Sequence, residues 1–142
     1  MACGAGKWGD WLVPDRPLGL DLHDTCELHD ALYVAPGGRS RWTCDVLWLR
    51  AMLSTVRKYH WRKWPHFYAI VLSYFLAVRW RGYTRGWKPC REAWGNLSAG
   101  ERVRAVYKAR SYLRIFGLPG GGLDESYGVR DGWSTLTSQD GM

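Results

Sequence analysis

LGLDLHDTCELHDALY, residues 18–33, decides the fold, and RWTCD at residues 41–45 completes it. Four residues of the first stretch stand at spacings of 0, 3, 4 and 7: Cys26, His29, Asp30 and Tyr33. On an α-helix of about 3.6 residues per turn these four share one face. A histidine beside a carboxylate, facing a second Cys-Asp pair one short loop later, favours activation of water next to a metal ion.

Composition indicates one basic, aromatic-rich domain. The 142 residues are enough for a single domain with a core of its own. Ten Trp and eight Tyr exceed ordinary usage, and such rings favour packed cores, membrane interfaces and protein contacts. The net charge of +7 favours an anionic partner, which is a phospholipid surface, a nucleic acid or an acidic protein. The charge alone does not choose among them.

Secretion, membrane insertion and zinc binding find no support in the sequence. The N-terminus lacks the apolar segment of a signal peptide. The longest apolar stretch, residues 67–78, is too short to span a bilayer. The four cysteines are too scattered for a zinc site and too sparse for a disulfide scaffold. We therefore expect a soluble chain.

Two helices should carry the candidate site. The first is expected over about residues 21–33, because PGG follows at residues 36–38. The second is expected over about residues 41–59, with Ser40 as its N-cap. Only about six residues join them, so the two helices should pack antiparallel.

Two further helices are expected. Pro65 fits the first turn of a helix to about Trp80, which is apolar nearly all round and should be buried. Residues 82–95 look irregular. A capping box at residues 98–101 opens the last helix, which should end before Gly117. The expected organisation is an all-α domain over residues 1–116 that begins with a Gly- and Trp-rich loop, followed by an irregular Gly-rich tail over residues 117–142.

The motifs resemble those of the phospholipase A2 superfamily, in particular its bacterial and fungal branch. That superfamily carries Cys-x-x-His-Asp on one helix and Cys-Asp on an antiparallel helix. The branch adds a preceding Pro-Asp-x-Pro-x-Gly, an aromatic residue three positions after the Asp, and a basic residue shortly before Cys-Asp. This chain has these elements in the same order: Pro14-Asp15-Arg16-Pro17-Leu18-Gly19, Cys26-Glu27-Leu28-His29-Asp30, Tyr33, Arg41 and Cys44-Asp45. The resemblance covers roughly residues 8–55.

A second resemblance reaches about residue 87. Small uncharacterised phage-encoded proteins share a layout that this chain matches at His29-Asp30-Ala31-Leu32-Tyr33, Ser40-Arg41 to Asp45, and Ala77-Val78-Arg79, followed by Gly82 and Trp87. It implies a virus-associated relative of the phospholipase fold, located in a virion or a host cytoplasm.

The residue types fit the chemistry of ester hydrolysis. A neutral imidazole accepts a proton from water near neutral pH, so His29 is the candidate general base. Asp45 would accept the other ring N–H and fix the tautomer, with an oxygen roughly 2.6–3.2 Å from an imidazole nitrogen. Asp30 would hold a hard cation, and the resemblance implies that this cation is calcium, which would polarise the ester carbonyl.

The resemblance also implies that the loop before the first helix supplies further calcium ligands. A register anchored on Pro14-Asp15 places them at Trp8-Gly9-Asp10, where the usual Asp-x-Cys is missing and Asp10 lies close enough to substitute. A second register uses Cys3-Gly4-Ala5-Gly6 and would pair Cys3 with Cys26 in a disulfide. We prefer the first register because its anchor is continuous with the helix.

Plainer interpretations stand beside the functional ones. Tyr33 lines the site or belongs to the core, Arg41 lines the site or is a surface charge or loop cap, and Cys44 is expected to be a buried thiol. The leading prediction is calcium-dependent hydrolysis of the sn-2 ester of glycerophospholipids at a membrane surface, serving membrane breaching by a virus particle. The alternative is a virion or tail structural protein without catalysis, which would contact other virion proteins through the C-terminal tail. A nucleic-acid-binding module ranks last because it rests on charge alone.

Overall fold

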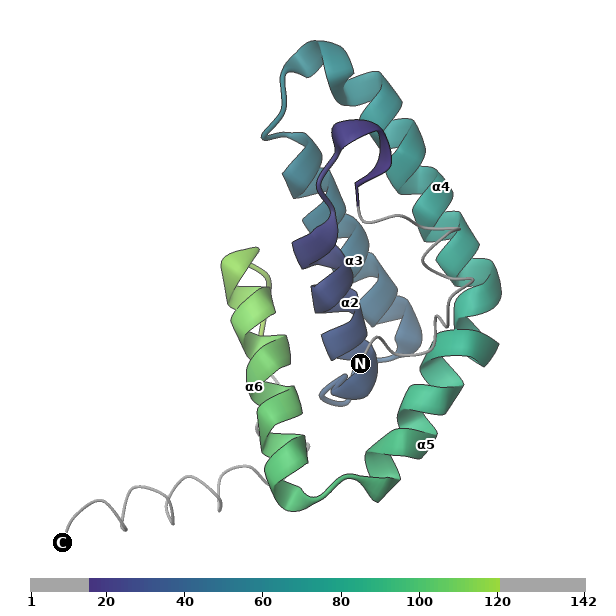
Figure 1. Cartoon of the computed structure of the whole chain (residues 1–142), viewed down its shortest axis with the longest axis vertical. Coiled ribbons are helices and arrows are strands. Elements are labelled where there is room, and N and C mark those ends of the chain that lie inside the picture. Colours follow the sequence, from purple (N-terminus) through teal and green to yellow (C-terminus); the bar gives the residue numbers. More distant parts are fainter. Residues whose placement is uncertain (1–15, 121–142) are drawn as a thin grey trace, which may run out of the picture.

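Four helical rods make up the part of the chain that the computed structural model describes, residues 16–120, and no strand occurs there (Figure 1). The rods are α2 (His23–Val34), α3 (Arg41–Val56), the continuous run of α4 (Trp64–Gly82), the π turn η3 (Tyr83–Trp87) and α5 (Lys88–Asn96), and α6 (Ala99–Ile115). Two short 3-10 turns, η1 (Pro17–Gly19) and η2 (Trp61–Lys63), precede α2 and α4. The prediction of an all-α fold is confirmed.

The first two helices form the expected antiparallel pair (Figure 1). After α2 the chain reverses through Gly37 and Gly38, whose φ angles of 61° and 74° lie in the left-handed region that favours glycine. Ser40 then caps α3, because its hydroxyl accepts a hydrogen bond from the Thr43 N–H at 3.2 Å. Below this cap the Cys44 thiol is buried, as predicted, and donates to the Leu32 carbonyl at 3.8 Å.

Residues 82–95, predicted to be irregular, are helical. The glycines that suggested a loop instead allow close packing against α2: a Cβ on Gly86 would lie 3.0 Å from the Tyr33 ring, and one on Gly82 would lie 3.3 Å from the Tyr33 hydroxyl. Pro89 is the second residue of α5 and directly follows the π turn. The π turn follows Gly82 and contains Gly86, and such turns often mark functional sites.

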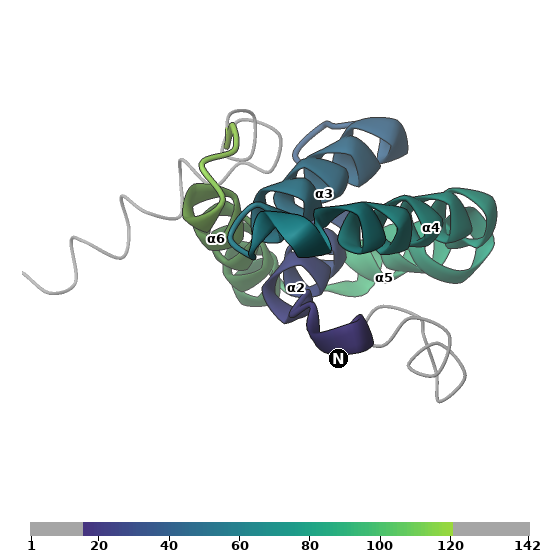
Figure 2. The same cartoon turned by 90° about the horizontal axis from the view of Figure 1, so that it is seen from above.

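The prediction that the third helix is buried is wrong. In α4 only Phe67 and Val71 are buried, whereas Leu72, Leu76 and Trp80 are 51%, 65% and 85% exposed. One face of the helix packs on α3 and the opposite face lies in solvent. Figure 2 shows α4 and α6 on opposite sides of the α2–α3 pair. Among the described residues, no helix has the length and apolar character needed to cross a membrane.

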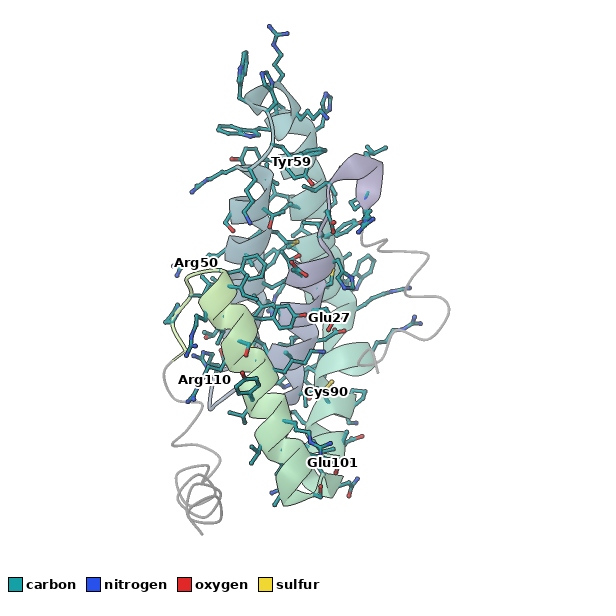
Figure 3. The ribbon with its side chains drawn as sticks, turned by 60° about the vertical axis from the view of Figure 1, so that its left-hand side comes forward. Glu27, Arg50, Tyr59, Cys90, Glu101 and Arg110 are labelled. Carbon is teal, nitrogen blue, oxygen red and sulfur yellow. The ribbon has the colours of Figure 1, made fainter. Side chains whose placement is uncertain are left out.

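The core lies in two clusters on either side of the α2–α3 pair. The first joins α2, α3, α5 and α6 around Leu28, Leu32 and Leu113, and the second joins α3 to α4 around Trp48 and Met52. Figure 3 shows Glu27 of α2 beside α6, where its Oε2 forms an ion pair with Lys108 Nζ at 2.6 Å.

Helix α6 has both predicted ends. The Ser98–Glu101 capping box is present at its start. At its end Gly117 takes a φ of 64° and the Leu118 N–H donates to the Leu113 carbonyl at 2.8 Å, a Schellman motif. Leu118 packs on the first core cluster, so the chain just beyond the predicted domain boundary at residue 116 turns back onto the helices.

Candidate functional site

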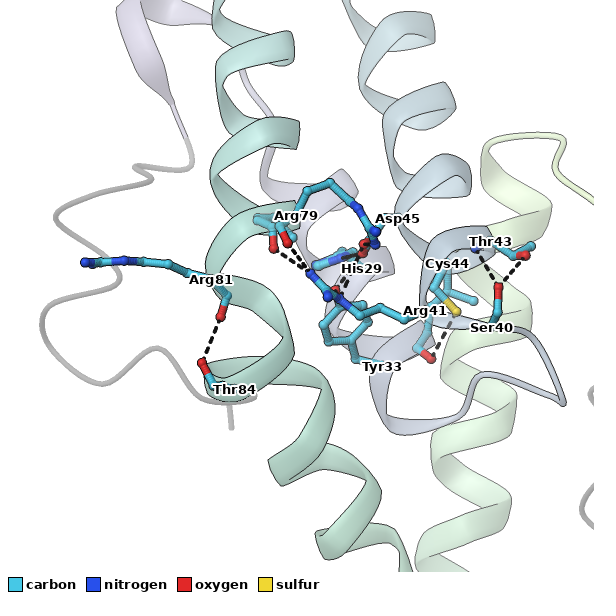
Figure 4. Close-up of polar contacts among 12 residues, drawn as sticks. His29, Tyr33, Ser40, Arg41, Thr43, Cys44, Asp45, Arg79, Arg81 and Thr84 are labelled. Atoms are coloured by element: carbon cyan, nitrogen blue, oxygen red, sulfur yellow. Dashed lines mark hydrogen bonds and ion pairs between the residues drawn. The ribbon is translucent and has the colours of Figure 1, made fainter.

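Asp45 is the centre of a buried polar cluster between α2, α3 and α4 (Figure 4). Its Oδ1 lies 2.9 Å from His29 Nε2 and accepts a hydrogen bond from the Tyr33 hydroxyl at 2.6 Å. Its Oδ2 accepts from Arg79 Nη1 at 2.8 Å. Because a carboxylate only accepts, Nε2 of His29 carries the proton in this pair. The predicted contact between His29 and Asp45 is confirmed.

Arg41 links the same cluster to the backbone of α4 by hydrogen bonds. Its Nη2 donates to the carbonyls of Val78 and Arg79 at 3.0 and 2.7 Å. Its Nε donates to the Tyr33 hydroxyl at 3.4 Å and lies 3.7 Å from Asp45 Oδ2. The Arg41 side chain is only 15% exposed, so it is neither a surface charge nor a cap on the loop.

Electrostatics keep Asp45 ionised. Burial by itself raises the pKa of the Asp45 carboxyl, but hydrogen bonds from His29, Tyr33 and Arg79 outweigh it, and the net pKa is lowered. Tyr33 shifts the other way: burial, with the hydrogen bond to Asp45, raises its pKa. Tyr33 therefore stays a phenol that donates to the carboxylate. The Tyr33 side chain belongs to the core and also contacts Asp45, and its role in lining a substrate site stays a prediction.

The imidazole of His29 is held between two aromatic rings. Its centroid lies 4.1 Å from that of Tyr33 and 4.4 Å from that of Trp48, which is stacked at 30°. With Nε2 bonded to Asp45, the orientation of the ring is fixed. Within the described part of the chain no hydrogen bond is formed by Nδ1, the nitrogen with a lone pair in this tautomer.

Sequence reasoning left Arg79, Trp48 and Trp87 out of the site. Trp87 packs edge-on against Tyr33 at 5.3 Å between centroids. Arg79 and Trp87 both stand in the stretch of sequence that carries the second resemblance, so a signal was present. The helical periodicity of α4 did not show that Arg79 faces the site. The helix is apolar on nearly every side, so its buried face is not evident from the sequence. Trp48 follows Asp45 by three residues, a spacing that puts both on one face of α3.

The predicted calcium ligands are only partly described. Asp30 is partly exposed on α2 and lies within electrostatic reach of Lys108 on α6, whose pKa is raised by its hydrogen bond to Glu27 first and by Asp30 among the lesser causes. The loop residues Trp8, Gly9 and Asp10 lie outside the described residues, as does Cys3. Over residues 16–120 no group of three or more His, Cys, Asp or Glu side chains is placed to hold a metal. Asp30 has the oxygen chemistry of a calcium ligand, and the completeness of that site stays a prediction.

Comparison with known proteins identifies no relative: no family model, no curated protein and no solved structure matches the chain. Function must therefore be inferred from the geometry of the site.

Proposed function

We propose that the chain is a phospholipase A2-like hydrolase that cleaves the sn-2 ester of glycerophospholipids with calcium, and that it serves membrane breaching by a virus particle. One observation carries the proposal: His29 Nε2 and Asp45 Oδ1 are 2.9 Å apart across two antiparallel helices, the contact that a His-Asp pair needs if Nδ1 is to act as the base. The matching motif order along the sequence, from the Pro-Asp anchor to Cys44-Asp45, supports the same activity.

The residues divide the work of hydrolysis as follows. Nδ1 of His29 takes a proton from water, whose oxygen attacks the carbonyl carbon of the ester. The Asp45 carboxylate stabilises the imidazolium that results, as in other His-Asp pairs. The imidazolium then gives its proton to the oxygen of the departing lysophospholipid. General base catalysis of this kind contributes about 10²–10⁴-fold in rate.

Tyr33, Arg41 and Arg79 are positioning residues in this scheme. By donating to Asp45 or by holding its neighbours, they keep the carboxylate charged and fixed toward Nε2. Calcium, held by Asp30 and the loop at Trp8-Gly9-Asp10, would supply polarisation of the ester carbonyl when bound. The tight packing of Trp48 on His29 limits the freedom of the base.

A second candidate is a virion or tail structural protein without catalysis. The same cluster favours this candidate: Asp45 accepts hydrogen bonds from α2 and α4 and forms an ion pair with Arg41 of its own helix, and such a network holds three helices together.

Fatty-acid release from mixed phospholipid vesicles, with calcium or with a chelator, tests the proposal. We expect calcium-dependent release by the wild type and its loss in His29→Gln, because glutamine cannot act as a general base near neutral pH. His66→Gln is the matched control, since His66 is exposed on α4. Asp45→Asn should add little to His29→Gln, because both act on one step. A wild type that releases no fatty acid from any vesicle composition, alone or assembled with its partners, supports the structural candidate instead.

A further inference from the structure

An apolar stripe runs along the solvent side of α4. Leu72, Leu76 and Trp80 recur every four residues, so they line one face of the helix, and all three are more than half exposed. Tyr83, 52% exposed, extends the stripe into the π turn. Single exposed apolar residues need no explanation, but a continuous stripe opposite the core marks an interaction surface.

The segment of the chain that carries this stripe has charges of one sign. Between residues 46 and 91 the sequence holds ten Lys and Arg and no Asp or Glu. Arg81, Arg85 and Lys88 are exposed on or just beyond α4, and Figure 4 shows Arg81 directed away from the His29–Asp45 cluster. In contrast, the exposed or partly exposed carboxylates of the described residues lie before or on α2, on α5 and on α6.

We propose that the outward face of α4, formed by Leu72, Leu76, Trp80 and Tyr83, together with the exposed Arg81 and Arg85 of the same helical run, docks on an anionic phospholipid surface. The inference rests on the proposed function for its choice of a lipid partner, and it adds the surface used and the charge of the headgroups. Leucines on one side of a helix enter the boundary of the acyl chains, tryptophan prefers the headgroup level, and arginines pair with phosphates.

The candidate site lies behind α4, on the side of the helix that packs against α3. The Arg79 guanidinium donates to buried Asp45 and also lies 4.9 Å from the ring centroid of Trp42, which is 56% exposed. Trp42 in turn meets Phe75 of α4 edge-on at 6.1 Å. One arginine side chain therefore separates the exposed Trp42, at the edge between α3 and α4, from the His29–Asp45 pair.

Vesicle co-sedimentation tests the docking surface, with His29→Gln as the parent protein so that hydrolysis does not alter the vesicles. The parent should pellet with vesicles of phosphatidylcholine and phosphatidylglycerol far more than with phosphatidylcholine alone, and salt should weaken binding. Adding Leu76→Ser and Trp80→Ser should weaken binding about tenfold or more, because each removes apolar area from the bilayer contact. Adding Arg81→Gln should weaken it about fivefold on anionic vesicles.

Matched variants on α6 serve as controls. Tyr107→Ser and Ile115→Ser remove side chains that are 60% and 65% exposed, and both should leave binding unchanged. Equal weakening by the α6 variants, or no preference for phosphatidylglycerol, overturns the inference. So does self-association of the parent that Leu76→Ser abolishes, which assigns the stripe to a second copy, or selective binding of duplex nucleic acid in place of vesicles.

The two proposals fail separately. Binding that depends on α4, with no fatty-acid release by the wild type, retains the docking surface and removes the hydrolase. Fatty-acid release together with binding that is indifferent to the α4 variants does the reverse.

Discussion

Replacing Asp45 by Asn tests the energetics of the buried cluster. The side chain keeps its shape, so the change removes a charge without opening a cavity. Breaking a buried ion pair by removing one partner costs about 3–5 kcal/mol. The Arg79 side chain is 31% exposed and can turn toward water, and the amide oxygen still accepts from Tyr33, so we expect the free energy of unfolding to fall by about 2–3 kcal/mol.

The pH dependence gives this prediction its sign. The folded-state pKa of Asp45 lies below the ordinary value of 3.8, so its stabilisation is complete above that value and is lost as the pH falls through the folded-state pKa. Urea unfolding followed by circular dichroism should therefore show a large difference between wild type and Asp45→Asn at neutral pH, which narrows below about pH 4. Asp24→Asn, an exposed carboxylate of α2, is the control. The reasoning is refuted if Asp45→Asn lowers the free energy of unfolding by less than about 1 kcal/mol at neutral pH, or if the difference from wild type does not change with pH.

Three further changes test other parts of the fold. Gly86→Ala should lower the free energy of unfolding by about 1–3 kcal/mol, because its Cβ would lie 3.0 Å from the Tyr33 ring, whereas Gly95→Ala, with no atom within 4 Å, should be neutral or stabilising in the same urea titration. Ser98→Ala should cost about 1 kcal/mol through loss of the N-cap, with faster hydrogen exchange in the first turn of α6 and no change in α3. Millimolar calcium should raise the melting temperature of the wild type but not of Asp30→Ala, and equal responses of the two proteins in a thermal-shift assay would argue against Asp30 as a ligand.

Local chemistry in the sequence predicted the paired helices and their caps. Ser40 and the Ser98–Glu101 box identify helix starts by side-chain hydrogen bonds that form within a few residues, so no tertiary knowledge is needed. The His29–Asp45 contact was also predictable, because it follows from motif spacing on two helices joined by a short loop.

Tertiary contacts explain what the sequence did not predict. Glycines in the segment after α4 indicate a loop by propensity, yet here they remove side chains that would collide with Tyr33. The burial of α4 was overestimated from its apolar residues. Hydrophobicity indicates which side chains can be buried, but it does not show whether another helix packs against them. Arg79 enters the site only because α4 packs on α3 at that particular rotation.

The π turn at Tyr83–Trp87 absorbs one extra residue within the continuous helical run. A π turn holds one residue more than an α turn, so deleting a single residue there should convert it to an α turn and leave α5 in the same helical phase. Arg91, which donates to the Tyr33 and Val34 carbonyls at the end of α2, and Cys90, which lies in the core, would then keep their partners. The same deletion within α4 or α5 would rotate all later residues of the run by about 100°, so the π turn is a position where the length of the chain can change without misaligning its two halves.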